Sequence, residues 1–173
     1  DVDAIKSLAK RYWSKNPIAL LGDLCDLGLD RGMEFDQKYG PQKQLDLVEE
    51  IFKPLDIRAY VTGNHSNRIF MKVGLTPYTS MFGMKPSNTL NINEREIFIN
   101  HGKSAAENIF LEFQKYVKYV NADVIALGHS HDLASISFMR GKKIQHLVRT
   151  GSFLGRPKYV IDAGFAPKIP GWA

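Results

Sequence analysis

Apolar and polar side chains follow one another along the first third of the chain in a way that predicts helices and strands in turn. Residues 1–15 and residues 41–53 carry apolar side chains at helical spacing. Between them, the run IALLG from Ile18 is continuously apolar and then breaks at glycine into acidic residues, which is typical of a buried parallel strand. The run IRAYVTGNH from Ile57 repeats this event. We therefore expect two helices and two strands that alternate here.

The second half of the chain continues the pattern. The run REIFINHG from Arg95 and the run DVIALGHSHD from Asp123 predict two more strands that end in polar loops, with a helix over residues 105–120 between them. The runs LASISFM and IQHLVRTG, joined by a basic turn, predict a hairpin. Strands that alternate with helices predict an α/β fold with a layered sheet.

Residues 69–95 show little clear periodicity, because apolar residues are interleaved with glycine and proline. A long irregular segment in a compact domain is either functional or wrongly assigned. We therefore leave two interpretations open, a lid or cap segment beside a site and a helical segment that the pattern does not reveal.

Polar side chains gather just after the predicted strands. Four of the five histidines lie there, together with Asp23, Asp26 and Asn64. Ligands of α/β sheets bind at the carboxyl ends of the strands, so we expect these side chains to meet in one crevice. His129 and His131 are two residues apart, a spacing that on an extended strand turns both rings to the same side. Histidine, aspartate and asparagine without cysteine suit Mn²⁺, Fe²⁺, Zn²⁺ or Ni²⁺.

Each of these signals has a plainer interpretation when it is taken alone. A single Gly-Asp after a strand is most often a turn or a helix cap, and a His-x-His pair is more often structural than metal-binding. Chance is a poor explanation for four histidines, an aspartate and an asparagine that all follow strands. We interpret His146 as structural, because it lies inside the predicted hairpin.

The ordered set GDLCD, GNH, a single histidine and GHSH resembles the calcineurin-like metallophosphoesterases. The resemblance extends from Ile18 to Phe153 and includes TGSF at residues 150–153. It implies a layered β-sandwich of mainly parallel strands flanked by helices, with two divalent metal ions at its end. Mn²⁺ is the favoured ion, and Fe, Zn and Ni stay open. The activity implied is hydrolysis of a phosphate ester through a metal-activated hydroxide.

The same resemblance assigns the metal ligands. Asp23 would bridge the two ions, since a carboxylate can span two dications that repel each other. Asn64, His101 and His129 would complete the second site, and His131 would belong to the first.

It also assigns three catalytic residues. His65 would contact the phosphate and give a proton to the leaving oxygen, and Asp26 would orient and charge the ring of His65. Arg68 would reach a phosphate oxygen, although a surface arginine in a loop is an equally good interpretation.

Two features depart from the family pattern. The family opens with Asp-x-His at the end of its first strand, and nothing before GDLCD matches it. We therefore expect the chain to lack its first strand, which would leave the first metal with only Asp23 and His131. Ser66 also stands where many members carry an acidic residue after Gly-Asn-His.

Composition narrows the function classes. The chain has 173 residues, of which 44% are hydrophobic and 24% charged, so we expect a single domain over residues 1–173. No apolar run could span a membrane. The single Cys25 excludes an internal disulfide and favours the cytoplasm. A net charge of +5 weakly favours polyanionic partners, nucleic acid among them.

Three functions remain. The leading hypothesis is a metal-dependent phosphodiesterase or phosphatase, with a phosphodiester slightly favoured as substrate. The second is a non-catalytic scaffold or binding protein of the same fold with an incomplete metal site. The third, a nucleic-acid-binding module, has only the charge in its favour. The substrate, the native metal and any homo-oligomer cannot be read from the sequence.

Overall fold

The computed structural model describes residues 2–29, 37–103, 108–153 and 171 of the chain. Contacts between α-carbons divide the chain into two compact units, Asp1–Pro86 and Ser87–Ala173, which we call the amino-terminal and carboxyl-terminal units. Each unit is considered by itself. The expectation of a single domain stays a prediction.

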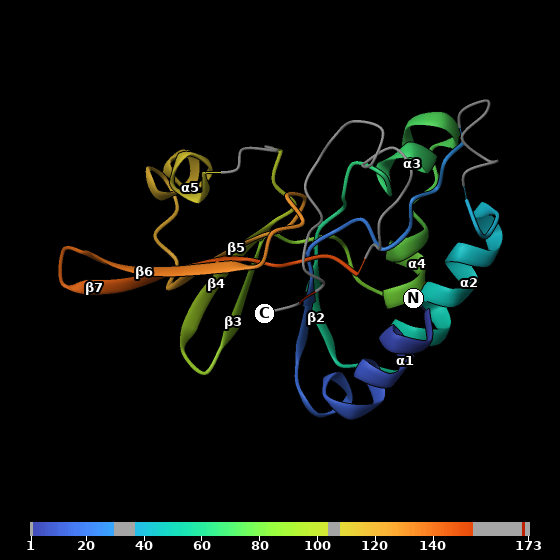
Figure 1. The fold of residues 1–173 in the computed structure, drawn as a ribbon, viewed down its shortest axis with the longest axis horizontal. Helices are drawn as coiled ribbons and strands as arrows, with labels where there is room; N and C mark the ends of the chain where they lie inside the picture. Colours follow the sequence, from blue (N-terminus) through green and yellow to red (C-terminus); the bar gives the residue numbers. More distant parts are fainter. Residues whose placement is uncertain (1, 30–36, 104–107, 154–170, 172–173) are drawn as a thin grey trace. The chain divides into compact units, whose positions relative to one another are not determined.

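The amino-terminal unit pairs two parallel strands with helices (Figure 1). Its elements in chain order are α1 (Val2–Arg11), a 3₁₀ turn (Trp13–Lys15), β1 (Ile18–Leu20), α2 (Pro41–Phe52), β2 (Ile57–Tyr60), α3 (Asn67–Val73) and α4 (Pro77–Phe82). Proline at the first turn of α2 lacks the N–H that a helix start leaves unbonded anyway. Gly74 and Gly83 end α3 and α4 with positive φ, a conformation that glycine adopts without strain. The two helices and two strands expected at the start of the chain are therefore confirmed.

The core of this unit joins the strands to three of its helices. Leu20 and Tyr60 of the strands pack with Val48 of α2, Ile69 of α3 and Tyr78 of α4. The apolar stripe of each helix is thereby removed from water, which is the main stabilising term for such short elements.

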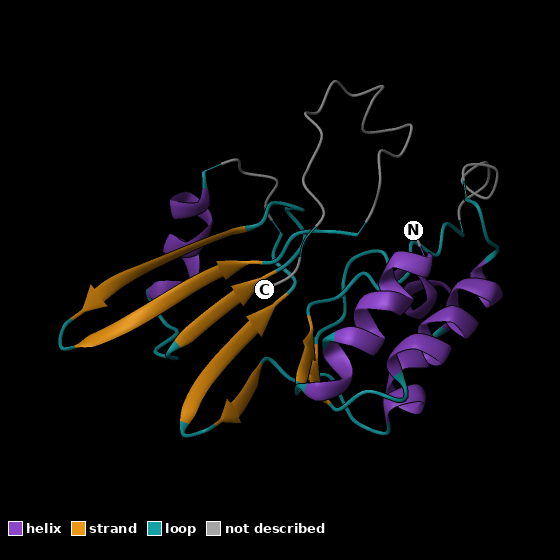
Figure 2. Cartoon of the chain, turned by 60° about the horizontal axis from the view of Figure 1, so that its bottom comes forward, coloured by secondary structure: helices purple, strands orange, loops and turns teal. Residues whose placement is uncertain are grey.

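The carboxyl-terminal unit is a five-stranded sheet in the order β3-β4-β5-β7-β6 (Figure 2). Its elements are β3 (Thr89–Ile92), β4 (Arg95–Asn100), α5 (Ile109–Val117), β5 (Val124–Leu127), β6 (Ala134–Arg140) and β7 (Lys143–Arg149). The strands β4, β5 and β7 are parallel, and the edge strands β3 and β6 pair antiparallel with their neighbours. The hairpin expected after GHSHD is confirmed as β6 and β7.

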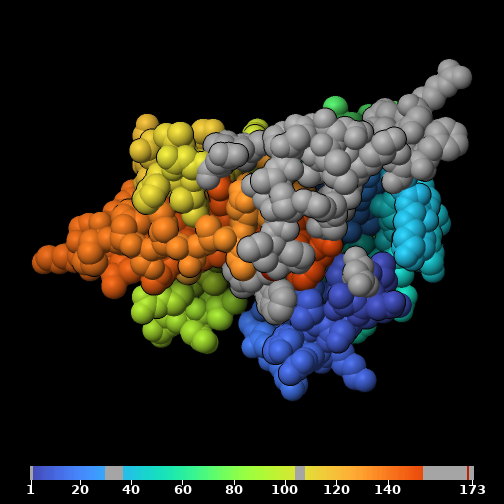
Figure 3. Space-filling view, viewed as in Figure 1, coloured from blue at the N-terminus to red at the C-terminus, as the bar shows by residue number. Residues whose placement is uncertain are grey.

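Helix α5 covers one face of this sheet. Phe113 and Tyr116 pack on Ile125, Leu127 and Leu147 of the central strands. Figure 3 shows the helix, in yellow, lying directly on the orange strands of the hairpin. We expected this helix to begin near residue 105, which lies outside the described residues, and the described helix begins at Ile109 after the capping side chain of Asn108.

Residues 69–95 are more regular than their sequence pattern. They hold the end of α3, all of α4 and the strand β3. Met81, Phe82 and Met84 pack against the core of the amino-terminal unit. The hydrophobic pattern did not reveal α3 and α4, because helices of six or seven residues make fewer than two turns and show too little periodicity. A role of this segment as a lid stays a prediction.

Candidate metal centre

The loops after β1 and β2 meet in the amino-terminal unit, because these two strands are parallel neighbours. The Oδ1 atom of Asp23 accepts a hydrogen bond of 2.8 Å from the backbone N–H of His65 and a longer one of 3.4 Å from that of Ser66. A Cβ atom at Gly63 would lie 2.0 Å from this oxygen, so only glycine lets the loops approach this closely. Asp23 itself has φ of +49°, a strained conformation of the kind that persists at functional sites.

The same loops bring together the three predicted catalytic residues. The Oδ1 atom of Asp26 is hydrogen-bonded to the Nδ1 atom of His65. Arg68 on α3 donates from one guanidinium nitrogen to the backbone oxygen of Asp26 at 3.0 Å and to its Oδ1 at 3.1 Å. The hydrogen bond from His65 is the main cause that lowers the pKa of Asp26, and the charges of His65 and Arg68 lower it further. With Nδ1 held by a carboxylate, Nε2 is the ring atom that His65 can offer to a substrate.

Arg68 therefore lies in a helix and holds a carboxylate, which differs from the alternative interpretation of a surface arginine in a loop. Asn64, between Gly63 and His65, is exposed at the tip of the same loop. The amino-terminal unit thus carries five of the eight predicted site residues, namely Asp23, Asp26, Asn64 and His65 in one pair of loops and Arg68 at the start of α3.

The carboxyl-terminal unit carries the other three, His101, His129 and His131. His101 follows β4 directly and His129 follows β5 by two residues, so the parallel pairing of these strands places both at one edge of the sheet. The Nε2 atom of His101 lies 3.2 Å from the Nδ1 atom of His129. A hydrogen bond between the rings can bridge this gap in the absence of metal.

This separation also suits two ligands of one ion. With zinc–nitrogen bonds of about 2.0–2.1 Å, two tetrahedral ligand atoms lie roughly 3.3–3.4 Å apart. His101 is buried and His129 half-buried, so both rings are held by their surroundings. The pair can therefore bind a divalent cation without a large movement of either ring.

The loop that carries His129 and His131 is not extended. The two residues have φ of +66° and +59°, and the backbone N–H of Ser130 bonds to the carbonyl of Gly128 at 2.8 Å. The strand ends at Leu127, so the same-side geometry of an extended strand does not apply to these two residues. Two non-glycine residues in left-handed conformation mark this loop as strained.

Sequence reasoning missed the residues that brace this edge. The Oδ1 atom of Asn100 accepts hydrogen bonds from the backbone N–H of Gly102 at 2.9 Å and from the hydroxyl of Tyr116 at 3.2 Å. An asparagine two residues before a glycine is a readable turn signal. Beneath it lie Glu112 and Arg149, each 1% exposed. No sequence signal reveals them, because charged residues are read as surface.

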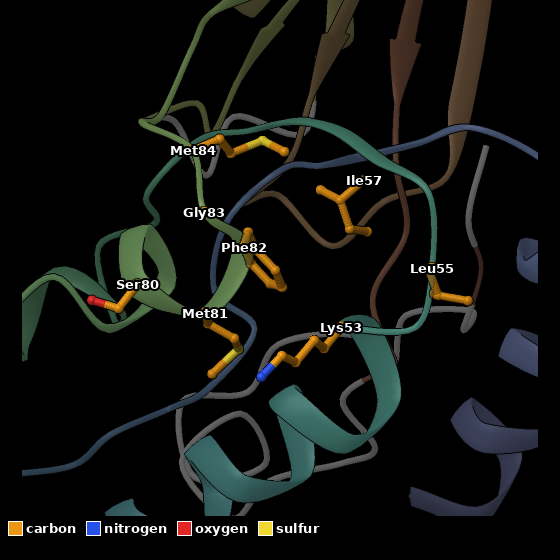
Figure 4. A pocket seen from close by; sticks show the side chains of 8 residues that line it. All are labelled: Lys53, Leu55, Ile57, Ser80, Met81, Phe82, Gly83 and Met84. Carbon is orange, nitrogen blue, oxygen red and sulfur yellow. The ribbon is translucent and has the colours of Figure 1, made fainter.

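A groove of about 370 Å³ opens elsewhere in the amino-terminal unit (Figure 4). It lies between the end of α2 and the end of α4, and the predicted site residues do not line it. It is lined by Lys53, Leu55, Ile57, Ser80, Met81, Phe82, Gly83 and Met84.

Comparison with known proteins identifies the fold. No family model matches the chain, and no curated protein matches it either. Among solved structures, the zinc complex of wild-type Vps29 from Entamoeba histolytica matches with a TM-score of 0.55 and 15% identity, over 95% of this chain and 72% of that one. A single mutant of the same protein matches with a TM-score of 0.51 and 15% identity, over 98% of this chain and 70% of that one. The chain has a fold like that of Vps29.

The predicted fold class is thereby confirmed. A conserved uncharacterized protein from Streptococcus pneumoniae, described as a predicted phosphoesterase, matches with a TM-score of 0.46 and 20% identity, over 88% of this chain and 66% of that one. At these identities the likeness shows the fold alone. The roles of the individual site residues stay predictions.

Proposed function

We propose that this protein is a metal-dependent phosphoesterase. The observation that carries the proposal is the approach of the His101 and His129 ring nitrogens to 3.2 Å, which suits a shared divalent ion. The hydrogen bond between Asp26 and His65 supports it independently, because a binding site for metal alone has no need of an oriented imidazole.

The residues that we propose as metal ligands are Asp23 and Asn64 in the amino-terminal unit and His101, His129 and His131 in the carboxyl-terminal unit. Vps29 was solved as a zinc complex, and the donor set here suits Mn²⁺ as well as Zn²⁺. When bound, such ions polarise a phosphate ester and lower the pKa of a water molecule.

Residues of the amino-terminal unit would then bind the phosphate and protonate the leaving group. Asp26 holds Nδ1 of His65, so that Nε2 can carry a proton to the leaving oxygen. Arg68 fixes Asp26 through one nitrogen, and a guanidinium has further donors that can reach a phosphate oxygen. These three residues therefore act as one unit that binds the phosphate and protonates the departing group.

The substrate we favour is a phosphodiester, of a nucleotide or a nucleic acid, because the chain carries a net charge of +5. The single cysteine fits the cytoplasm, which we propose as the compartment. The described part of the chain has no helix with both the length and the apolar character that a membrane crossing takes.

The test combines calorimetric titration of Mn²⁺ and Zn²⁺ with hydrolysis of bis-p-nitrophenyl phosphate and p-nitrophenyl phosphate. We expect metal-dependent turnover, faster on the diester, that is lost together with metal binding in His101→Ala. His146→Ala is the matched control, because this exposed histidine lies on β7 and contacts Ser137. Bound metal without turnover on either ester would refute the enzyme, and absence of metal binding would refute the centre.

A binding protein of the same fold is the second candidate. The groove lined by Phe82 and Met84 favours it, because these two side chains can contact an apolar side chain of a partner protein (Figure 4). Under this alternative His65→Asn changes no measured property, whereas the enzyme loses turnover and keeps its metal.

A further inference from the structure

The carboxyl-terminal unit buries an ion pair directly beneath its histidine loops. The Nε atom of Arg149 donates to Oε2 of Glu112 at 2.9 Å, and a terminal guanidinium nitrogen lies 2.7 Å from the same oxygen. Both side chains are 1% exposed. Two donors therefore converge on one oxygen, and the other oxygen, Oε1, has no hydrogen-bond partner within the described residues.

The unpartnered oxygen faces the loop that follows His101. A Cβ atom built at Gly102 would lie 3.0 Å from Oε1 of Glu112, 3.4 Å from the carbonyl oxygen of Gly128 and 3.6 Å from Cβ of His129. Gly102 is thus enclosed between the carboxylate and the loop of His129. A shift of Glu112 toward Gly102 would therefore press on the loop that follows His101, because close-packed interiors transmit displacement.

Arg149 reaches the same loops from the other side. It ends β7 and pairs with Leu127, the last residue of β5 before the loop of His129. One of its terminal nitrogens lies 3.6 Å from an oxygen of Asp132, where that loop ends. The guanidinium of Arg149 therefore connects α5 with Asp132, and the strand pairing of the same residue with Leu127 places it beside the start of the loop that carries His129 and His131.

Stability does not explain why this pair is charged. Desolvation of two buried charges offsets most of their attraction, and apolar side chains of similar volume are often as stable or more stable at such positions. We propose that Glu112 and Arg149 are positioning residues that hold the His101 and His129 rings at the spacing a divalent ion requires. The inference rests on the proposed function in taking these two histidines as metal ligands.

The test replaces the pair by apolar side chains in Glu112→Leu/Arg149→Met. We expect a melting temperature equal to or above that of the wild type, together with Mn²⁺ and Zn²⁺ affinity lowered about 10–100-fold, the usual effect of altering groups behind metal ligands. In the metal-free protein, the ¹⁵N ring signals of His101 and His129 should shift or broaden while those of His146 stay in place. Lys143→Met is the matched control, because it removes a cation at the opposite end of the sheet.

Each outcome decides the matter. Unchanged metal affinity and unchanged ring signals in a folded double variant overturn the positioning role and leave the proposed function standing. If the wild type binds no metal, the proposed function fails, and the ring signals alone decide whether the pair positions the histidines. If the double variant does not fold, Arg149→Lys replaces it, since lysine keeps the charge but cannot bridge Glu112 and Asp132 with a fork of donors. Wild-type affinity and ring signals in Arg149→Lys would then overturn the inference.

Discussion

Asp26 and His65, 39 residues apart in sequence, are joined by a hydrogen bond between a carboxylate oxygen and the Nδ1 atom of the imidazole. This contact exists because β1 and β2 are parallel neighbours whose loops leave the same edge. It keeps the pKa of Asp26 below its ordinary value and leaves Nε2 as the ring nitrogen of His65 that Asp26 does not hold.

The first prediction concerns this pair. His65→Asn should lower kcat about 10²–10⁴-fold on a metal-dependent phosphodiester assay, because a positioned general acid contributes that much. Asp26→Asn should lower kcat by a smaller factor. The amide of asparagine still holds the imidazole ring of His65, but it no longer favours the charged form of that ring. Metal affinity should be unchanged in both variants by calorimetry. A parallel loss of metal affinity would assign His65 to the ligands instead.

The second prediction concerns the approach of Gly63 to Asp23. In Gly63→Ala the new methyl group would meet Oδ1 of Asp23, so we expect the loops to separate at a cost of about 1–3 kcal/mol in unfolding free energy. Metal affinity should fall together with stability, because Asp23 loses the hydrogen bond that it accepts from the backbone N–H of His65. Urea denaturation and calorimetry measure the two effects.

Gly40→Ala is the control for this prediction, because a Cβ atom there has no neighbour within 4 Å. Gly40 stands at the N-cap of α2, where alanine is less favourable than glycine, so a change of up to about 1 kcal/mol is expected. Metal affinity should equal that of the wild type. If Gly63→Ala and Gly40→Ala lose the same amount of unfolding free energy and metal affinity, the close approach of Gly63 to Asp23 has no special role.

The third prediction concerns the hairpin of β3 and β4. Its two turn residues, Asn93 and Glu94, have φ of +49° and +64°, the conformation of a type I′ turn. Glycine at the second position removes the left-handed penalty, so Glu94→Gly should raise the unfolding free energy by about 1 kcal/mol. Glu94→Ala should bring no such gain, because alanine keeps the penalty. Thermal melts of the three proteins provide the comparison.

The fourth prediction is a pH dependence at Asp123. The backbone N–H of Glu96 donates to its carboxylate at 2.9 Å, and this bond, followed by Lys143 and Arg95, lowers the pKa of Asp123. A carboxyl with a lowered folded pKa stabilises fully above its unfolded value of about 3.9 and loses that contribution as the pH falls through the folded pKa. The wild type should therefore lose melting temperature more steeply than Asp123→Asn between about pH 5 and pH 2. If the melting temperatures of the wild type and of Asp123→Asn fall in parallel with pH, the charge of Asp123 does not stabilise the fold.

The sequence by itself determined the order of most elements and the residues that follow the strands. Continuous apolar runs mark strands that are buried on both faces, and the glycines after them mark where the chain turns. These are local properties, so β1, β2, β4 and β5 and the hairpin could be predicted. The candidate residues could be named for the same reason, since each stands in a short motif such as GNH or GHSH.

Tertiary structure decided which of these residues meet and what holds them. The bond between Asp26 and His65 and the pair of Glu112 and Arg149 join positions 39 and 37 residues apart. No local pattern encodes such pairs, because a charged residue that is buried against a partner has the same sequence appearance as one that faces water. Strand pairing brings the partners together, and it depends on packing across the whole unit.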